Sequence, residues 1–151
     1  MRTKESVLQT YNKIYSPWML WKWGIFFYET SLTFEIIITL FFWAVLFPLM
    51  KSYSAWTFID HITPILILTI DYCLNRIPFS LRHLPLSMGL MLIYGIVNMT
   101  YTLVTGKPIY PPLNFHDVMS FVWTVVLGSL EAAGFLGMYH LTQWKLRKVN
   151  K

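Results

Sequence analysis

The chain alternates between long apolar runs and short polar connections. A helix needs about 20 mostly apolar residues to cross a bilayer. Four runs meet this length, and we predict membrane spans at residues 25–50, 56–77, 84–105 and 118–141. Helices satisfy their own backbone hydrogen bonds inside lipid. The pattern therefore predicts an all-α integral membrane protein, a bundle of four transmembrane helices.

Residues that break or cap helices mark the ends of these spans. Pro48 closes the first span, Pro78 follows the second, and Gly106 begins a proline-rich connection after the third. Asn114 or Asp117 is expected to cap the fourth helix.

Three regions follow from this division of the chain. Residues 1–24 alternate tyrosine and tryptophan with lysine and polar side chains, which predicts a helix lying in the membrane interface. An ordinary aromatic belt beside the first span is the alternative. Residues 25–141 form the four-helix transmembrane domain, and residues 142–151 form a basic C-terminal tail.

The composition supports a membrane location. The chain is 56% hydrophobic and 13% charged, whereas soluble domains average about 25% charged residues. The net charge of +5 does not indicate nucleic-acid binding, because the basic residues lie in connections between apolar runs rather than along one face. The single cysteine, Cys73, excludes a disulfide within the chain and a multi-cysteine metal site.

The basic residues also predict the orientation. With four spans, both termini share a side, and the opposite side carries Lys51 and Lys107 alone. We therefore expect both termini to face the cytoplasm, or the matrix of a mitochondrion, in the endoplasmic reticulum or mitochondrial inner membrane. The ten remaining basic residues are Arg2, Lys4, Lys13, Lys22, Arg76, Arg82, Lys145, Arg147, Lys148 and Lys151.

Five acidic residues fall on the predicted spans: Glu29, Glu35, Asp60, Asp71 and Glu131. An ionised acid in hydrocarbon is costly, so these side chains should face the interior and be paired or protonated. Glu35 and Glu131 lie nearest the middle of their spans. They are expected to share a proton, to bind a cation, or to hydrogen-bond to neighbouring hydroxyl groups.

Two histidine–acid pairs are candidates for chemistry. His61 follows Asp60 near the start of the second span, and it is either a general base acting on a lipid ester or a helix-end histidine in the headgroup region. His116 and Asp117 are expected on the same membrane side. Because no helical spacing typical of metal ligands occurs, we predict no metal site and no cofactor other than bound phospholipid.

The fourth predicted helix carries small residues at steps of four, namely Ser129, Ala133 and Gly137. Small side chains at this spacing let helices approach closely. The partner helix is either within the chain or in another subunit.

Several segments resemble a known family. They are YETSLTFEIIITLFFWAVLFP, the Asp60-His61 pair, TIDYCLNRIPFSLRHL and YTLVTGKPIYPPLNF. Their order and spacing, over residues 25–116, resemble the rolling-stone and androgen-induced type of multipass membrane proteins. Some animal members of that group are similar to threonine hydrolases, which cleave fatty-acid esters of hydroxy fatty acids with a threonine and a histidine inside the membrane.

The resemblance implies that His61 matches the histidine of those hydrolases by position. Their threonine lies on an earlier helix, for which this chain has no counterpart, and Thr33 and Thr39 lie in a different span. We therefore expect that the hydrolase activity is lost or was never present.

Three functions follow from these observations. We expect a non-catalytic multipass subunit of a larger membrane complex, such as a mitochondrial respiratory or ATP-synthase assembly, with membrane lipids and other membrane subunits as partners. The first alternative is an intramembrane lipid ester hydrolase that uses His61 with Asp60 or Asp71. The second is a small transporter or proton-conducting module that uses Glu35 and Glu131.

Overall fold

The computed structural model describes residues 18–149 apart from positions 51 and 53, and this part of the chain is helical with no strand. The elements are α2 (Trp18–Phe41), η1 (Phe42–Leu46), η2 (Phe47–Leu49), α3 (Ala55–Leu74), η3 (Leu81–His83), α4 (Leu84–Thr105) and α5 (Val118–Val149). Most of the predicted interfacial segment, residues 1–17, lies outside the described residues. Its remainder, from position 18 to 24, belongs to α2.

Four helical stretches are long and apolar enough to cross a membrane, as the sequence predicts. They are Leu20–Leu49, Ala55–Leu74, Leu81–Thr105 and Val118–Lys148. The second stretch ends earlier than predicted because Asn75 leaves the helix in an extended conformation. The fourth is longer than predicted because α5 continues into the basic tail.

Local sequence explains where the helices end. Pro48 has no N–H group to continue the helix; the turn before it is π-helical (η1), and Pro48 itself lies in the 3-10 turn that follows (η2). Gly106 ends α4 with a φ of 66°, in the left-handed region that glycine adopts without a steric penalty. Its N–H donates to the carbonyl of Thr102 over 2.9 Å.

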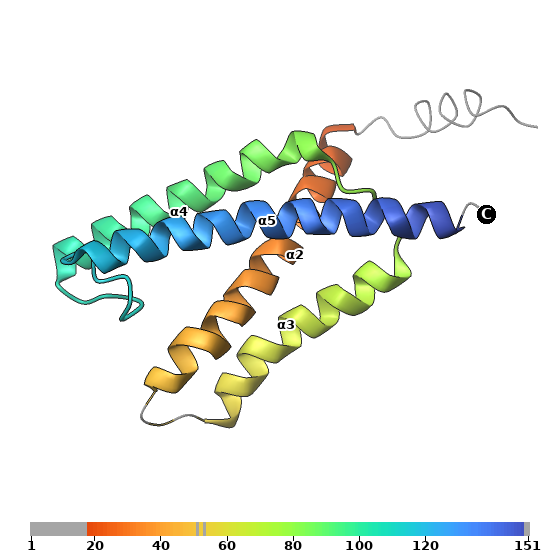
Figure 1. Ribbon diagram of the computed structural model, residues 1–151. Helices are drawn as coiled ribbons and strands as arrows, with labels where there is room; N and C mark the ends of the chain where they lie inside the picture. The colour runs from red at the N-terminus through yellow and green to blue at the C-terminus, as the bar shows by residue number, and fades with distance from the viewer. Residues whose placement is uncertain (1–17, 51, 53, 150–151) are drawn as a thin grey trace, which may run out of the picture.

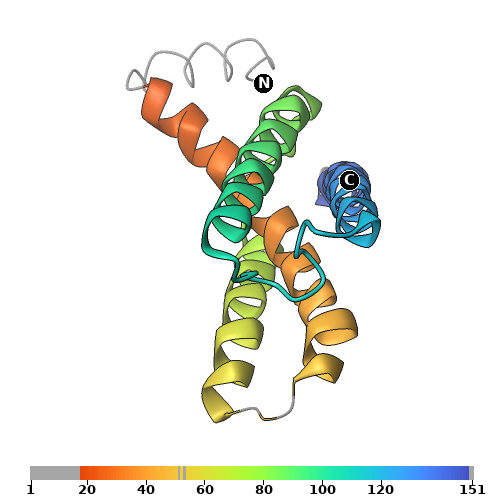
Figure 2. The same ribbon diagram turned by 90° about the vertical axis from the view of Figure 1, so that its left-hand side faces the viewer.

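The helices form two antiparallel pairs joined through α2. In Figure 1, α4 and α5 lie side by side, while α2 and α3 extend away from them at a steep angle. Figure 2 shows α2 (red to orange) crossing the view obliquely from the upper left, and ending at about the same level as the start of α3 (yellow). Because α2 contacts both α3 and α5, it is the central helix.

The buried apolar core lies where α2, α3 and α5 meet. It contains Leu32, Tyr72, Phe79, Phe135 and Met138. Phe79 comes from the connection between α3 and α4, and its ring packs edge-on against that of Phe135 with centroids 5.5 Å apart. This connection is therefore anchored inside the protein rather than lying on its surface.

The outer faces of the helices are apolar and exposed. Leu92, near the middle of α4, is 65% exposed, and Val125 on α5 is 69% exposed. Such side chains would be unfavourable in water, but lipid tails are as apolar as they are. A smaller set of polar side chains is buried between the helices, and these form the contacts described next.

Candidate functional site

The most buried acid lies where three helices meet. Glu131 on α5 is 0% exposed. Its Oε1 atom lies 2.7 Å from Ser87 Oγ on α4 and 3.1 Å from Thr33 Oγ1 on α2. Its Oε2 atom is buried and has no hydrogen-bond partner among the residues that the structure describes. Glu131 therefore joins all three helices through one carboxyl oxygen.

A second buried acid joins α2 to the turn before α4. Glu29 is 0% exposed, and its Oε1 accepts a hydrogen bond from the backbone N–H of Ser80 over 3.0 Å. Its Oε2 lies 2.7 Å from Nδ1 of His83, whose side chain is 24% exposed. The sequence places Glu29 on a span, but a pairing with a histidine 54 residues later carries no sequence signal.

Polar side chains also gather at the end of α3. The amide nitrogen of Asn75 donates to Tyr28 Oη over 2.7 Å and to Asp71 Oδ2 over 2.8 Å. Lys145 of α5 donates from Nζ to the backbone carbonyls of Tyr72 and, over 2.6 Å, of Asn75. The positive charge of Lys145 thus caps the negative end of the α3 dipole.

His61 lies against α2 rather than beside Asp71. Its ring stacks on Phe42 with centroids 3.5 Å apart, and Thr39 Oγ1 donates to its backbone carbonyl over 3.4 Å. Glu35, one turn before Thr39, interacts electrostatically with His61. Asp60, which the sequence pairs with His61, is exposed. The structure therefore places a threonine against the backbone of the predicted histidine, and a glutamate within electrostatic range of it.

The predicted cap of the fourth helix forms. The Asp117 carboxylate accepts hydrogen bonds from the backbone N–H of Ser120 over 2.9 Å and from the Asn114 amide over 2.9 Å. These hydrogen bonds, with that from Asn114 the largest, hold the pKa of Asp117 below its ordinary value. His116 uses its backbone N–H to donate to Asn114 Oδ1.

No group of three or more metal-ligating side chains occurs among the residues that the structure describes. The two histidine–acid pairs therefore do not assemble into such a group. Cys73 is a free cysteine, exposed on α3. A thiol is weakly polar, and a position facing lipid does not penalise it.

The predicted small-residue line of α5 faces away from the other helices. Ser129, Ala133 and Gly137 are all exposed, and an added Cβ at Gly137 would meet nothing within 4 Å. The hydroxyl group of Ser129 donates to the carbonyl of Val125 in its own helix over 2.8 Å. This line is thus apolar, narrow and uncovered by the described chain.

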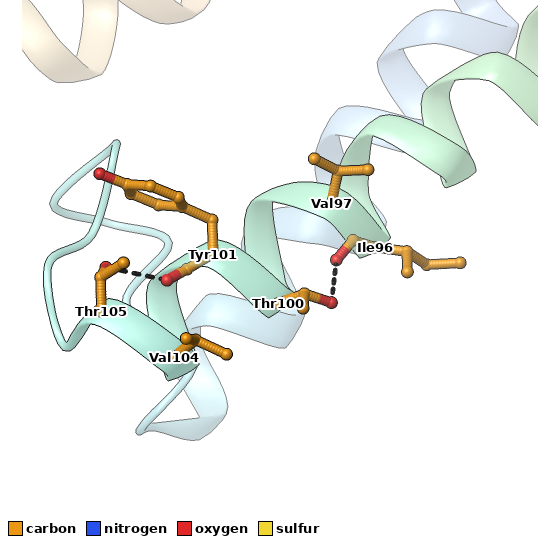
Figure 3. A pocket seen from close by; sticks show the side chains of 6 residues that line it. All are labelled: Ile96, Val97, Thr100, Tyr101, Val104 and Thr105. Atoms are coloured by element: carbon orange, nitrogen blue, oxygen red, sulfur yellow. Dashed lines mark hydrogen bonds between the residues drawn. The ribbon is translucent and has the colours of Figure 1, made fainter.

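A shallow groove of about 380 Å³ lies on the outer face of α4. Figure 3 shows that all its lining residues come from this one helix. The hydroxyl groups of Thr100 and Thr105 donate to backbone carbonyls one turn earlier, so they offer no hydrogen to a bound molecule. The lining residues are Ile96, Val97, Thr100, Tyr101, Val104 and Thr105.

Buried polar residues recur along α5 and α4 with a regular spacing. Ser120, Glu131 and Thr142 are 11 residues apart on α5, and Ser87 and Asn98 are 11 apart on α4. Eleven residues make about three helical turns, so each set shares one face. The sequence contains this signal, which identifies the inward face of both helices.

Comparisons with protein-family profiles, curated proteins and solved structures find no match for this chain. The resemblance to the rolling-stone and androgen-induced type of membrane protein stays a prediction.

Proposed function

We propose that this protein is a multipass membrane protein that serves as a non-catalytic subunit of a larger membrane complex. Four helices of spanning length support the membrane location. The buried polar groups link helices to each other: Glu131 joins α2, α4 and α5, and Glu29 joins α2 to the turn before α4. These contacts fit a structural role, in which polar groups hold helices together in lipid.

The observation that carries the proposal is the uncovered line of small residues on α5. Within the described chain, Ser129, Ala133 and Gly137 make no close helix contact, although their spacing suits one. A helix of another subunit is the partner that this line fits. The groove on α4 is apolar and suits a lipid acyl chain, which supports bound phospholipid as a second contact.

The test is extraction in a mild detergent at native expression, followed by native gel electrophoresis and mass spectrometry. The wild-type chain should migrate at fixed stoichiometry in a large complex. Ala133→Trp should release it, because the bulky ring fills the line. The matched control is Leu92→Trp, at an exposed midpoint of α4, which should stay in the complex. A wild-type chain migrating as a small, lipid-bound species would overturn the proposal.

The orientation and organelle are proposed from charge. If each helix crosses the membrane once, the start of α2, the end of α3, the start of α4 and the end of α5 share one side. Two contacts support this grouping of helix ends: Glu29 of α2 meets His83 before α4, and Lys145 of α5 meets Asn75 after α3. Among the described residues, six basic side chains belong to these ends (Lys22, Arg76, Arg82, Lys145, Arg147 and Lys148), whereas Lys107 belongs to the opposite ends. We propose that the side with the six basic residues faces the cytoplasm or the mitochondrial matrix. A respiratory or ATP-synthase assembly of the mitochondrial inner membrane is the proposed complex.

A second candidate function is hydrolysis of a lipid ester near the end of α2. The supporting observation is that Thr39 contacts the backbone of His61 and that Glu35 interacts electrostatically with it. A hydroxyl, an imidazole and a carboxylate are the groups that nucleophilic catalysis requires. In the structure, however, the Thr39 hydroxyl contacts the backbone carbonyl of His61 and not its imidazole. The His61 imidazole ring stacks on Phe42 instead. Catalysis would require both side chains to reorient.

Purified protein and a fatty-acid ester substrate test this candidate. Thr39→Ala and His61→Ala should each abolish cleavage, whereas Thr63→Ala, an exposed threonine on α3, should not. Cleavage that survives both substitutions would remove Thr39 and His61 from the mechanism.

A further inference from the structure

The contacts of Thr33 limit where hydrogen atoms can lie around Glu131. The Thr33 hydroxyl oxygen lies 3.0 Å from the carbonyl of Glu29, 3.0 Å from that of Thr30 and 3.1 Å from Glu131 Oε1. A threonine hydroxyl carries one hydrogen, so it can donate to only one of these three oxygens. Threonine in a helix commonly donates to a carbonyl one turn earlier. In that arrangement the contact with Glu131 needs its hydrogen from the Glu131 carboxyl group.

The remaining contacts of Glu131 point the same way. Ser87 and Thr33 both approach the same oxygen, Oε1, and the buried Oε2 has no partner within the described part of the chain. An ionised carboxylate would leave one charged oxygen buried without any donor, which is costly. A neutral carboxyl group instead donates from Oε1 to Thr33, accepts from Ser87, and leaves an uncharged carbonyl oxygen at Oε2.

The titratable groups around this site define its connection to one membrane surface. The elements packed around Glu131 contribute Glu29 and Glu35 from α2 and His83 from η3, and α4 contains no acidic or basic side chain. Glu29 lies one turn from Thr33 and contacts His83, which is partly exposed. Chains of histidine and acidic residues inside membranes are typical of proton relays.

We propose that Glu131 is a proton-binding site, whose proton exchanges with one membrane surface through Glu29 and His83. Inward transfer moves one proton from the His83 imidazolium to the Glu29 carboxylate, and then one proton from the Glu29 acid to the Glu131 carboxylate. The reverse order returns the proton to the surface, and no other bond is made or broken. The site depends on the membrane-spanning arrangement but not on assembly with other subunits.

Infrared spectroscopy of the full-length chain in lipid vesicles tests the site itself. At neutral pH the spectrum should contain the carbonyl-stretch band of a protonated carboxyl group. Glu131→Gln should remove this band, and the matched change Glu35→Gln should leave it. Ser87→Ala removes a hydrogen bond to Oε1, the hydroxyl oxygen, and leaves the acid and its unbonded carbonyl at Oε2, so the band should persist in this variant. A wild-type spectrum without the band, or a band that persists in Glu131→Gln, would overturn the proposal.

Deuterium exchange of the same band tests the route. Glu29→Gln should slow the exchange by about a hundredfold, the scale of a lost proton-transfer group. His83→Gln should slow it similarly, and Glu35→Gln should not. Equal exchange rates in Glu29→Gln, His83→Gln and the wild type overturn the route.

Loss of the band on adding sodium chloride at constant pH would show that a sodium ion displaces the proton, and would overturn the assignment of a proton as the ligand. Native gel mobility is a separate readout, so this proposal and the subunit proposal can fail independently.

Discussion

Replacing Lys145 with methionine should loosen the attachment of α5 to the end of α3. The methionine keeps the length and apolar stem of the side chain but removes the charge and the donors. In the wild-type protein Lys145 Nζ donates to the carbonyls of Tyr72 and Asn75 and lies 4.5 Å from the centre of the Tyr72 ring. The substitution leaves both carbonyls without this partner at the end of a helix.

The expected loss follows from these contacts. A hydrogen bond from a charged group contributes about 1.5–3 kcal/mol, and a cation at a helix C-terminus adds about 0.3–1 kcal/mol. Lys145 is only half-buried, so water replaces part of what the methionine removes. We therefore expect Lys145→Met to lower the free energy of unfolding by about 2 kcal/mol, roughly the value of one such hydrogen bond.

Reversible unfolding in mixed detergent micelles measures this loss. The matched control is Lys148→Met, the same change one turn later on α5. Lys148 is exposed and lies 4.0 Å from the centre of the Trp144 ring, so its removal should cost below about 1 kcal/mol. Equal losses for the two variants would show that Lys145 does not cap α3, and would refute the reasoning.

Two further predictions concern the ends and the packing of α5. Hydrogen bonds hold the pKa of Asp117 below its ordinary value. The contribution of Asp117 to stability is therefore present above pH of about 4 and is lost as the pH falls through the pKa of the folded protein. Asp117→Asn keeps an N-cap, but the melting temperature of this variant should lack that dependence on acid. A Cβ at Gly134 would lie 3.6 Å from Ile37 Cδ1, so Gly134→Leu should cost about 1–3 kcal/mol in the same unfolding assay. Gly137→Leu, in open space, should stay within about 0.5 kcal/mol, and equal costs would contradict the packing of α2 on α5.

Much of the fold was predictable because each element depends on neighbouring residues. Apolar runs gave the four helices, and Asp117 was one of two residues predicted to cap α5. The boundaries that differ depend on more distant parts of the chain. Asn75 ends α3 early where its side chain reaches Tyr28 on α2 and its carbonyl accepts from Lys145 of α5.

The site was predictable only in part. An acid in the middle of a span must face inward, which identifies Glu131 as buried. Its partners are hydroxyl groups on two other helices, and hydroxyl residues are too common in the chain to single out Thr33 and Ser87. Glu35 looked equivalent by depth, but it is only partly buried, whereas Glu131 is fully buried. Depth along a span does not determine the direction in which a side chain points.

The 11-residue spacing explains how this chain could select one arrangement of its helices in lipid. Apolar side chains contact lipid tails about as well as they contact another helix, so apolar area alone does not align helices in a membrane. Glu131 bonds across to Ser87, and Thr142, three turns later on the same face, bonds to Tyr72 of α3 over 3.1 Å. Each contact fixes a different neighbour against α5. Two polar contacts on one face therefore set both the rotation of α5 and the positions of α3 and α4 along it.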